Sequence, residues 1–264
     1  MTQTKKAYSL DMDGTLYLDD ELIEGAKDFV ELLEAKSIPY VLLTNNSSNH
    51  AKAYVEKFHT LGLKIPLSKI ITSGQATIHH LKKHHSTLKR LCLLGNRFLR
   101  EEFMDAGFTL IDEGLDLDAV VLGFDTELTY QKLWHASDAL VAGKPYFATH
   151  PDSVCPLKGG AFMPDVGAFI ELLKKATTRE PIIIGKPYAP MMDVVEALLN
   201  TPKEHITVVG DRLYTDMQMA SDYGMQSVLV LSGETTEAMI KASALKPTRV
   251  VASVKTLYEE LKTT

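Results

Sequence analysis

Near its start the chain reads Lys6-Ala7-Tyr8-Ser9-Leu10-Asp11-Met12-Asp13-Gly14-Thr15. The first half of this stretch is mostly apolar and predicts a short buried strand. Asp11 and Asp13 stand two residues apart, so in an extended chain both side chains face the same side. Two carboxylates in one place repel each other, and a divalent cation is the simplest compensation. Gly14 permits a sharp turn, and the Thr15 hydroxyl suits a cap or a turn.

Two other interpretations of this stretch stay open on its residues alone. It could be an acidic turn that follows a strand and takes no part in chemistry. It also resembles the first residues of a calcium loop, Asp-x-Asp-Gly. The twelfth position counted from Asp11, however, is Leu22, where such a loop needs a glutamate.

The composition is that of an ordinary globular protein, with 264 residues, 45% of them hydrophobic and 23% charged. The net charge of −6 argues against nucleic acid as the main partner but permits a small anionic substrate. Cys92 and Cys155 show no zinc-binding or disulfide spacing, which predicts a reducing cytoplasm. Residues 1–6 are polar and the apolar run after them is far too short for a signal peptide, so none is expected, and no apolar run approaches the length of a membrane span.

Apolar runs and amphipathic segments alternate along the chain, which predicts an α/β fold with a doubly wound parallel sheet. Residues 1–85 and 180–264 are predicted to form this core, and residues 86–179 an inserted α/β cap domain. A small hairpin is expected at 16–23 and a long irregular loop at 150–164. The predicted strands after the first are 38–43, 69–71, 91–95, 108–111, 119–123, 146–149, 181–185, 206–210 and 227–231. The predicted helices are 26–36, 50–61, a segment after Gly74 through His85, 97–106, 129–142, 166–177, 189–199, 217–223, 236–244 and 254–261.

Polar side chains gather where four of the predicted core strands end, which is where open parallel sheets bind ligands. These side chains are Asp11, Asp13, Thr44, Asn45, Asn46, Lys186, Asp211 and Asp216. Together they supply an acidic group able to hold Mg²⁺, one cation and neutral donors, a set that suits a phosphoryl group. Each has an ordinary alternative, since asparagines favour turns and caps and aspartates favour helix starts. Their joint occurrence at four strand ends favours the functional interpretation.

The tetrapeptide Gly-Lys-Pro-Tyr occurs twice, at 143–146 and at 185–188. Lys144 precedes a predicted strand and so lies at its amino end, away from chemistry. Lys186 follows a predicted strand and so lies at the edge where ligands bind. The position alone therefore selects Lys186 as the functional lysine.

These residues form four motifs, namely Asp11-Met12-Asp13-Gly14-Thr15, Thr44-Asn45-Asn46, Gly185-Lys186-Pro187, and Gly210-Asp211 through Thr215-Asp216. The set resembles the four motifs of the haloacid dehalogenase superfamily. The large insert between the second and third motifs resembles the NagD-like and nitrophenylphosphatase-like phosphatases of that superfamily. The resemblance runs nearly the full length and includes the loop at 148–152. One departure is Pro164-Asp165-Val166-Gly167, where the family often has Pro-Gly-x-Gly.

The resemblance implies a Mg²⁺-dependent phosphatase of small phosphorylated metabolites, such as sugar phosphates and nucleotides, that also accepts aryl phosphates in vitro. By that resemblance Asp11 is the nucleophile, and Asp13 is first the general acid and then the general base. The metal would be held by Asp11, the main-chain carbonyl of Asp13 and Asp211, with Asp216 supporting it from outside.

The remaining roles follow from the same resemblance. Thr44, Asn45 and Asn46 would bind the substrate phosphate, and Lys186 would offset its charge. Asp152, in the loop at 150–164, is a candidate for contact with the substrate.

Two other functions stay open, and so do the natural substrate and the oligomeric state, with a homodimer as one option. A phosphotransferase or mutase could use the same scaffold. A signalling receiver module also carries an acidic cluster with a threonine and a lysine, but the chain length, the insert and Asp13 argue against it. Four histidines at 79, 80, 84 and 85 could hold a metal, although a solvated basic helix face explains them more simply.

Overall fold

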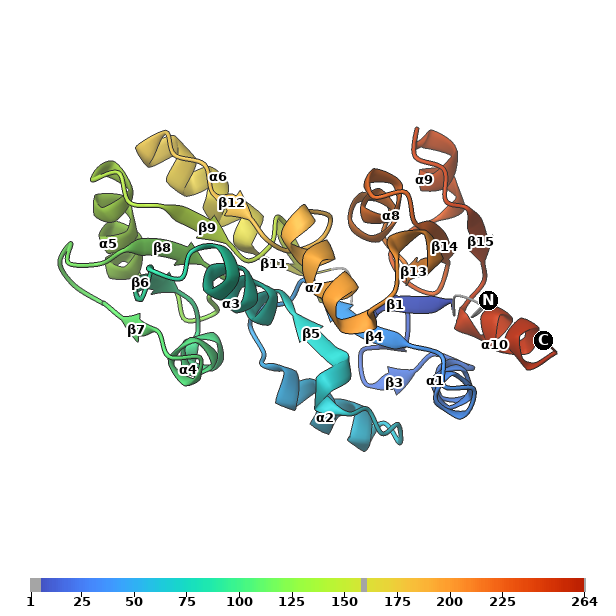
Figure 1. Ribbon diagram of the computed structural model, residues 1–264. Helices are drawn as coiled ribbons and strands as arrows, with labels where there is room; N and C mark the ends of the chain where they lie inside the picture. The colour runs from blue at the N-terminus through green and yellow to red at the C-terminus, as the bar shows by residue number, and fades with distance from the viewer. Residues whose placement is uncertain (1–5, 158–160, 264) are drawn as a thin grey trace. The chain divides into compact units, whose positions relative to one another are not determined.

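The computed structural model describes residues 6–157 and 161–263 (Figure 1). Contacts divide the chain into two compact units. Unit 1 contains the described residues of 1–44, 52–71 and 192–264, and unit 2 contains those of 45–51 and 72–191. Both are built from parallel sheets and helices, which confirms the predicted α/β class. The predicted polar start at 1–5, and residues 158–160 of the predicted loop, lie outside the described residues.

The sheet of unit 1 has the strand order β15-β14-β13-β1-β4-β5. Its strands are β1 (Ala7–Asp11), β4 (Tyr40–Thr44), β5 (Ile70–Thr72), β13 (Ile206–Gly210), β14 (Gln226–Val230) and β15 (Arg249–Val251). β1 pairs in parallel with both β13 and β4, so that Leu10 lies opposite Val209 on one side and Leu42 on the other. All three of these leucine and valine side chains are buried, as expected of a sheet covered on both faces.

Helices and short turns surround this sheet. The helices are α1 (Ala26–Ala35), α2 (Ala51–Thr60), α7 (Ala189–Leu199), α8 (Gln218–Asp222), α9 (Glu237–Ala242) and α10 (Val254–Lys262). Short 3₁₀ turns cover Leu67–Lys69 and Lys203–His205, and a π-helical turn covers Leu213–Met217. α1 packs against α10 (Figure 1), and Phe29 of α1 meets Tyr8 of β1 edge-on with ring centroids 5.6 Å apart. The predicted hairpin is present as the antiparallel pair β2 (Tyr17–Leu18) and β3 (Glu21–Leu22).

Unit 2 contains a second parallel sheet in the order β12-β9-β8-β6-β7. Its strands are β6 (Arg90–Leu94), β7 (Thr109–Leu110), β8 (Ala119–Leu122), β9 (Tyr146–Ala148) and β12 (Ile182–Ile183). Its helices are α3 (Ser73–His84), α4 (Arg97–Asp105), α5 (Tyr130–Val141) and α6 (Val166–Thr177). Thr129 caps α5 by accepting a hydrogen bond from the Lys132 amide.

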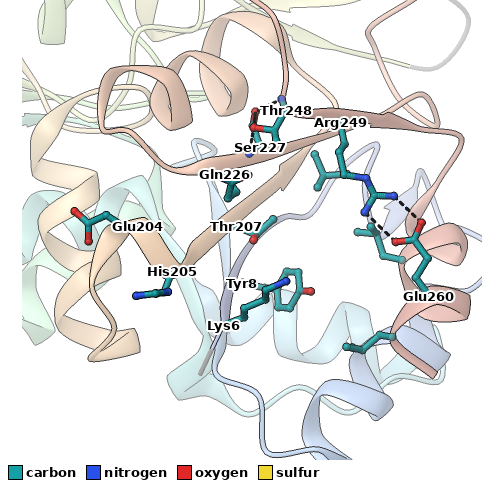
Figure 2. A pocket seen from close by; sticks show the side chains of 13 residues that line it. Lys6, Tyr8, Glu204, His205, Thr207, Gln226, Ser227, Thr248, Arg249 and Glu260 are labelled. Atoms are coloured by element: carbon teal, nitrogen blue, oxygen red, sulfur yellow. Dashed lines mark hydrogen bonds and ion pairs between the residues drawn. The ribbon is translucent and has the colours of Figure 1, made fainter. Parts of the chain in front are cut away.

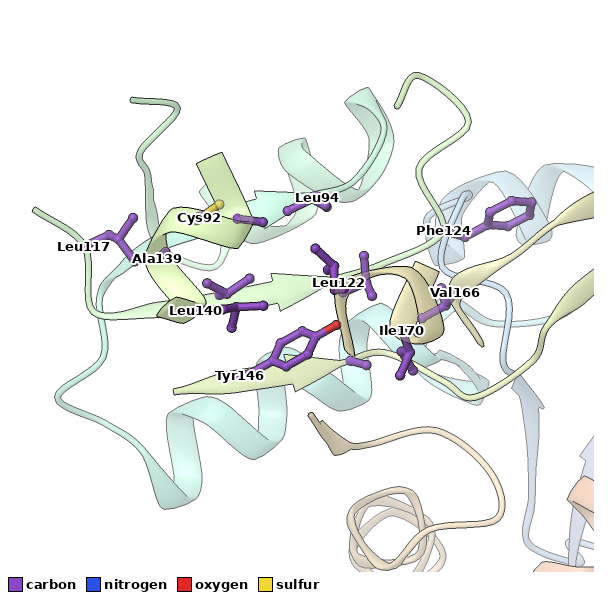
Figure 3. Close-up of a cluster of buried hydrophobic side chains, with 14 residues drawn as sticks. Cys92, Leu94, Leu117, Leu122, Phe124, Ala139, Leu140, Tyr146, Val166 and Ile170 are labelled. Atoms are coloured by element: carbon purple, nitrogen blue, oxygen red, sulfur yellow. The ribbon is translucent and has the colours of Figure 1, made fainter. Parts of the chain in front are cut away.

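The core of unit 2 follows from the two-residue alternation of its strands. Tyr146 and Ala148 of β9 face the apolar side chains of α5 and α6, as do alternate residues of β6 and β8 (Figure 3). Phe147, between them in sequence, points to the other face and contacts His85, which directly follows α3, with ring centroids 5.0 Å apart. Helices therefore cover both faces of the sheet, which explains why its strands are apolar throughout.

Three elements differ from the sequence prediction. The strand expected to resume the first sheet is β12, and it pairs instead with β9 of unit 2, with Ile182 opposite Phe147. The apolar run was recognisable, but such a run carries no information about which sheet it joins. The predicted loop at 150–164 contains an antiparallel hairpin, β10 (Val154–Pro156) and β11 (Phe162–Pro164). β15 was not predicted, because only three residues form it and two of them are exposed. The domain limits 86–179 remain a prediction.

Glu102 provides a test of the packing between α3 and α4. Its carboxyl group lies beside Gly74 of α3, and burial, with Asp105 nearby, raises its pKa from 4.5 to about 7. The buried charge of Glu102 therefore lowers the free energy of unfolding as the pH rises from 4.5 to 7. Below pH 4.5 the carboxyl group is protonated in both the folded and the unfolded chain, so this loss of stability is absent. Glu102→Gln should raise the free energy of unfolding at pH 8 by on the order of 1–3 kcal/mol, and by much less at pH 4.5. Urea unfolding at both pH values measures this, with the exposed Glu101→Gln as the control. Equal effects at the two pH values would contradict it.

Candidate active site

The carboxyl ends of three adjacent strands of unit 1 bring functional side chains together. β1 lies between β4 and β13, so strands that come later in the sequence flank β1 on both sides. Asp11 is the last residue of β1, and Asp211 directly follows the end of β13. Thr44 is the last residue of β4 and comes one residue after the residue that pairs with Asp11. This is the change of strand order at which open α/β sheets bind ligands.

Three carboxylates at this edge form a group that fits a divalent cation. One carboxylate oxygen from each of Asp11, Asp211 and Asp216 lies within 4.8 Å of the other two. Asp211 and Asp216 are buried and Asp11 is half-buried, so their mutual repulsion is poorly screened by water. Oxygen ligands of this kind are those that Mg²⁺ prefers. Asp216, expected outside the metal site, offers an oxygen within the same 4.8 Å limit, which makes it a candidate direct ligand.

The loop after β14 holds Asp211 in place, a support that the sequence did not reveal. The Glu234 amide donates a hydrogen bond to Asp211 Oδ2 over 2.6 Å. Gly14 and Gly233 lie against the same carboxylate, and a Cβ atom at either position would overlap it. Ser232 Oγ donates to the Gly14 carbonyl over 2.8 Å, which joins this loop to the turn after β1. The only sign of this support in the sequence was the Ser232-Gly233 pair at the end of a predicted strand.

Asp13 stands apart from the three clustered carboxylates and is exposed. Its immediate surroundings nevertheless remove water from the carboxyl group and raise its pKa, while Arg212 and Lys57 partly oppose the shift. Arg212 is itself paired with Glu234, with 3.0 Å between Nε and Oε2. A carboxyl group that keeps its proton to higher pH is suited to protonate a leaving group.

A cavity of about 490 Å³ lies at the opposite edge of the same sheet (Figure 2). It is lined by residues at the amino ends of the strands, including Tyr8, Thr207, Gln226 and Arg249. Arg249 is already engaged by Glu260 through two hydrogen bonds of 2.9 and 2.6 Å. The acidic residues that could hold a metal lie at the carboxyl ends, so this cavity is separate from the candidate active site.

Unit 2 brings together three other residues singled out from the sequence. Asn45 is buried, and its side-chain oxygen accepts a hydrogen bond from the Lys186 amide over 2.8 Å. Its side-chain nitrogen donates to the Lys186 carbonyl and to Asp152 Oδ1, each over 3.0 Å. Lys186 is only 3% exposed. The sequence selected all three residues but did not reveal that they contact one another.

The structure also places the less specific candidates. Asn46 Oδ1 accepts hydrogen bonds from the Ser48 amide and hydroxyl, each over 2.8 Å, which is the turn that the sequence allowed as an alternative. Lys144 precedes β9 and Lys186 follows β12, so the two lie at opposite strand ends of the unit 2 sheet, whereas the sequence predicted Lys186 at the edge of the core sheet. The four histidines in and directly after α3 are not among the residues that could hold a metal within the described ranges. His80 and His85 instead pack on Phe147.

Comparison with known proteins identifies the family. A profile of haloacid dehalogenase-like hydrolases matches residues 8–109, and a related hydrolase profile matches residues 183–257. Acid sugar phosphatase of Staphylococcus haemolyticus is 30% identical over 257 residues, which cover 97% of this chain and 97% of the relative. The chain belongs to the haloacid dehalogenase-like hydrolases. It is a phosphoric monoester hydrolase by this relationship.

Solved structures of this hydrolase family agree with that assignment. The 4-nitrophenylphosphatase of Thermotoga maritima matches with a TM-score of 0.91 and 40% identity, covering 97% of both chains. NagD of Escherichia coli K-12 matches with a TM-score of 0.87 and 29% identity, covering 96% of this chain and 98% of its own. The resemblance to NagD-like and nitrophenylphosphatase-like proteins is therefore confirmed. Neither Cys92 nor Cys155 of this hydrolase forms a disulfide. Across the described ranges, no helix combines the length and apolar character that a membrane crossing needs.

Proposed function

We propose that this hydrolase is a Mg²⁺-dependent phosphatase of small phosphorylated metabolites that works through an aspartyl-phosphate on Asp11. The observation that carries the proposal is the group of carboxylates from Asp11, Asp211 and Asp216 within 4.8 Å of one another. Such a group cannot receive an anionic phosphate ester unless a cation offsets its charge. The similarity to an acid sugar phosphatase and a 4-nitrophenylphosphatase supports sugar phosphates as first substrates, with nucleotides next and aryl phosphates in vitro.

Two carboxyl groups divide the chemistry between them. A carboxylate oxygen of Asp11 attacks phosphorus, the bond to the leaving oxygen breaks, and Asp13 gives its proton to that oxygen. Asp13, now ionised, takes a proton from water as that water attacks the aspartyl-phosphate. Inorganic phosphate leaves and the Asp11 carboxylate is restored. A bound Mg²⁺ ion would offset negative charge on the phosphoryl group and on Asp11.

The phosphate-binding roles rest on the four-motif resemblance. Thr44, Asn45 and Asn46 would bind phosphate oxygens, and Lys186 would supply a fixed positive charge. The side chains of Asn45 and Asn46 already accept or donate the hydrogen bonds described above. We therefore assign the contact of these two residues with phosphate to their main-chain N–H groups and that of Thr44 to its hydroxyl.

Metal removal tests the proposal. Dialysis against EDTA should lower hydrolysis of 4-nitrophenyl phosphate by at least about 10²-fold, because a metal ion supplies several kcal/mol of charge stabilisation, and Mg²⁺ should restore it. Calorimetric titration with Mg²⁺ should show weaker binding for Asp211→Asn and Asp216→Asn than for the exposed control Asp222→Asn. Full activity in metal-free buffer, or equal Mg²⁺ affinity in all three variants, would contradict the metal assignment.

The same assay separates hydrolysis from group transfer. A phosphatase releases one inorganic phosphate for each alcohol, whereas a phosphotransferase or mutase releases less than one when an acceptor alcohol is present. We propose that this chain is a phosphatase, since the relative from Staphylococcus haemolyticus is named as a phosphatase. A homodimer and a cytoplasmic location remain predictions from the sequence.

A further inference from the structure

The main chain of Lys186 is held from both sides by one buried amide. Asn45 accepts from the Lys186 N–H over 2.8 Å and donates to the Lys186 carbonyl over 3.0 Å. The Asn45 amide has two N–H hydrogens, and the second points to Asp152 Oδ1 over 3.0 Å. The main-chain carbonyl of Asn45 also accepts a short hydrogen bond from Ser73 Oγ. Asn45 is thus fixed at both ends, and through it so is the backbone from which the Lys186 side chain extends.

A buried histidine lies between Asp152 and a second carboxylate, that of Asp165. His150 is fully buried, with Nδ1 3.9 Å from Asp152 Oδ2 and Nε2 3.6 Å from Asp165 Oδ1. Asp152 and Asp165 keep only 7% and 6% of their side chains exposed. Packed this closely, the three buried side chains limit one another's rotation.

The backbone around Asp152 is also fixed, by the start of helix α6. The Gly167 amide donates to the Asp152 carbonyl over 2.8 Å, and the Asp165 amide donates to the Ser153 carbonyl over 3.0 Å. Gly167 has no room for a Cβ atom, which would overlap the Pro151 carbonyl oxygen. At 164–167 the chain has Pro-Asp-Val-Gly where the family often has Pro-Gly-x-Gly. The second glycine of that pattern, Gly167, is the one that this close approach needs, and it is present.

We propose that Asp152 is a positioning residue that acts through Asn45 to place Lys186, with His150 and Asp165 packed so that the Asp152 side chain keeps its orientation. This inference rests on the proposed function, in which Lys186 offsets phosphoryl charge. It differs from the substrate contact predicted for Asp152, because both carboxylate oxygens already face groups of the protein. A carboxylate can only accept hydrogen bonds, so Asp152 fixes which end of the Asn45 amide faces it and which faces the Lys186 N–H.

A double-mutant cycle with Lys186 tests whether Asp152 acts through it. Displacement of a catalytic group by about 1 Å can cost about 10²-fold, so Asp152→Ala should lower kcat/KM by about 10–100-fold in the wild-type background. In a Lys186→Met background the same change should lower it by less than about 2-fold, since the group to be positioned is gone. Asp152→Asn, which keeps the shape and an acceptor oxygen, should fall between wild type and Asp152→Ala. The exposed Asp138→Ala is the control and should leave kcat/KM unchanged.

Hydrogen exchange gives a second readout that needs no activity. The Lys186 amide should exchange at least about 10-fold faster in Asp152→Ala and Asp152→Asn than in wild type, because its acceptor Asn45 is released. The Val120 amide, which donates to the Pro145 carbonyl over 2.9 Å in the same unit, should be unchanged in both variants. Equal acceleration at both amides would mean general loosening of unit 2 and would overturn the proposal.

The outcomes separate this inference from the proposed function. Multiplicative effects of Asp152→Ala and Lys186→Met in an active enzyme would show that Asp152 acts independently of Lys186, which overturns the positioning role alone. A wild-type protein that hydrolyses no phosphate ester would overturn the proposed function, and the exchange of the Lys186 amide would still decide whether Asp152 positions it.

Discussion

Asp11→Asn is expected to lower phosphatase turnover by on the order of 10⁴-fold or more, the largest effect of any single substitution considered. The amide is a poor nucleophile, so no phosphoryl group can be transferred to position 11. The substitution also removes one of three carboxylates whose oxygens lie within 4.8 Å of one another. Because like charges repel there, the metal-free variant should melt no lower than wild type.

Three measurements check this prediction. Steady-state assays with an aryl phosphate give turnover, thermal unfolding in EDTA gives stability, and rapid quench with mass spectrometry detects phosphate on the chain. Asp20→Asn, in the exposed turn of the β2–β3 hairpin, is the control and should keep full activity. Appreciable turnover by Asp11→Asn would mean that water attacks the substrate directly and that the nucleophile is misassigned.

Asp13→Asn is expected to slow hydrolysis of an alkyl phosphate by about 10²–10⁴-fold, the usual contribution of a general acid or base. The loss should be smaller for an aryl phosphate, whose leaving oxygen needs little protonation. Burial raises the pKa of Asp13 and so favours the protonated acid that the first step requires. The second step still lacks its base, so the aspartyl-phosphate on Asp11 should accumulate with the aryl substrate.

The comparison of two leaving groups decides this prediction. Rapid-quench samples should contain phosphorylated chain in Asp13→Asn at early times and much less in wild type. Mg²⁺ affinity should largely survive, because the main-chain carbonyl is retained. Equal slowing of both substrates without a trapped phosphoenzyme would remove Asp13 from the general-acid role.

The residues of the candidate metal site could be predicted from the sequence, because topology alone brings them together. Parallel strands β4, β1 and β13 end at one edge, so side chains that follow them must converge there. The close approach of Asp216 to Asp11 and Asp211 was not predictable. It depends on the π-helical turn at 213–217, whose backbone path leaves no distinct pattern in the sequence.

The surroundings of Lys186 were beyond sequence reasoning for another physical reason. Asn45 and Lys186 are 141 residues apart, and their hydrogen bonds depend on how two loops meet in space. Hydrophobic periodicity predicts that an element forms but not which sheet it joins, as β12 illustrates. The contact of His150 with Asp165 was not predictable for the same reason, since it depends on how the loop between them folds back.

Three glycines, Gly14, Gly210 and Gly233, surround the acidic group and limit which substitutions this protein can accept during evolution. At positions 14, 210 and 233 any added side chain would overlap Asp211 or Asp216. Substitutions there displace a candidate metal ligand. Natural variation and laboratory libraries should therefore tolerate almost nothing at these positions. Larger side chains can be accepted elsewhere, for example in the β10–β11 hairpin, where Val154 and Phe162 are exposed.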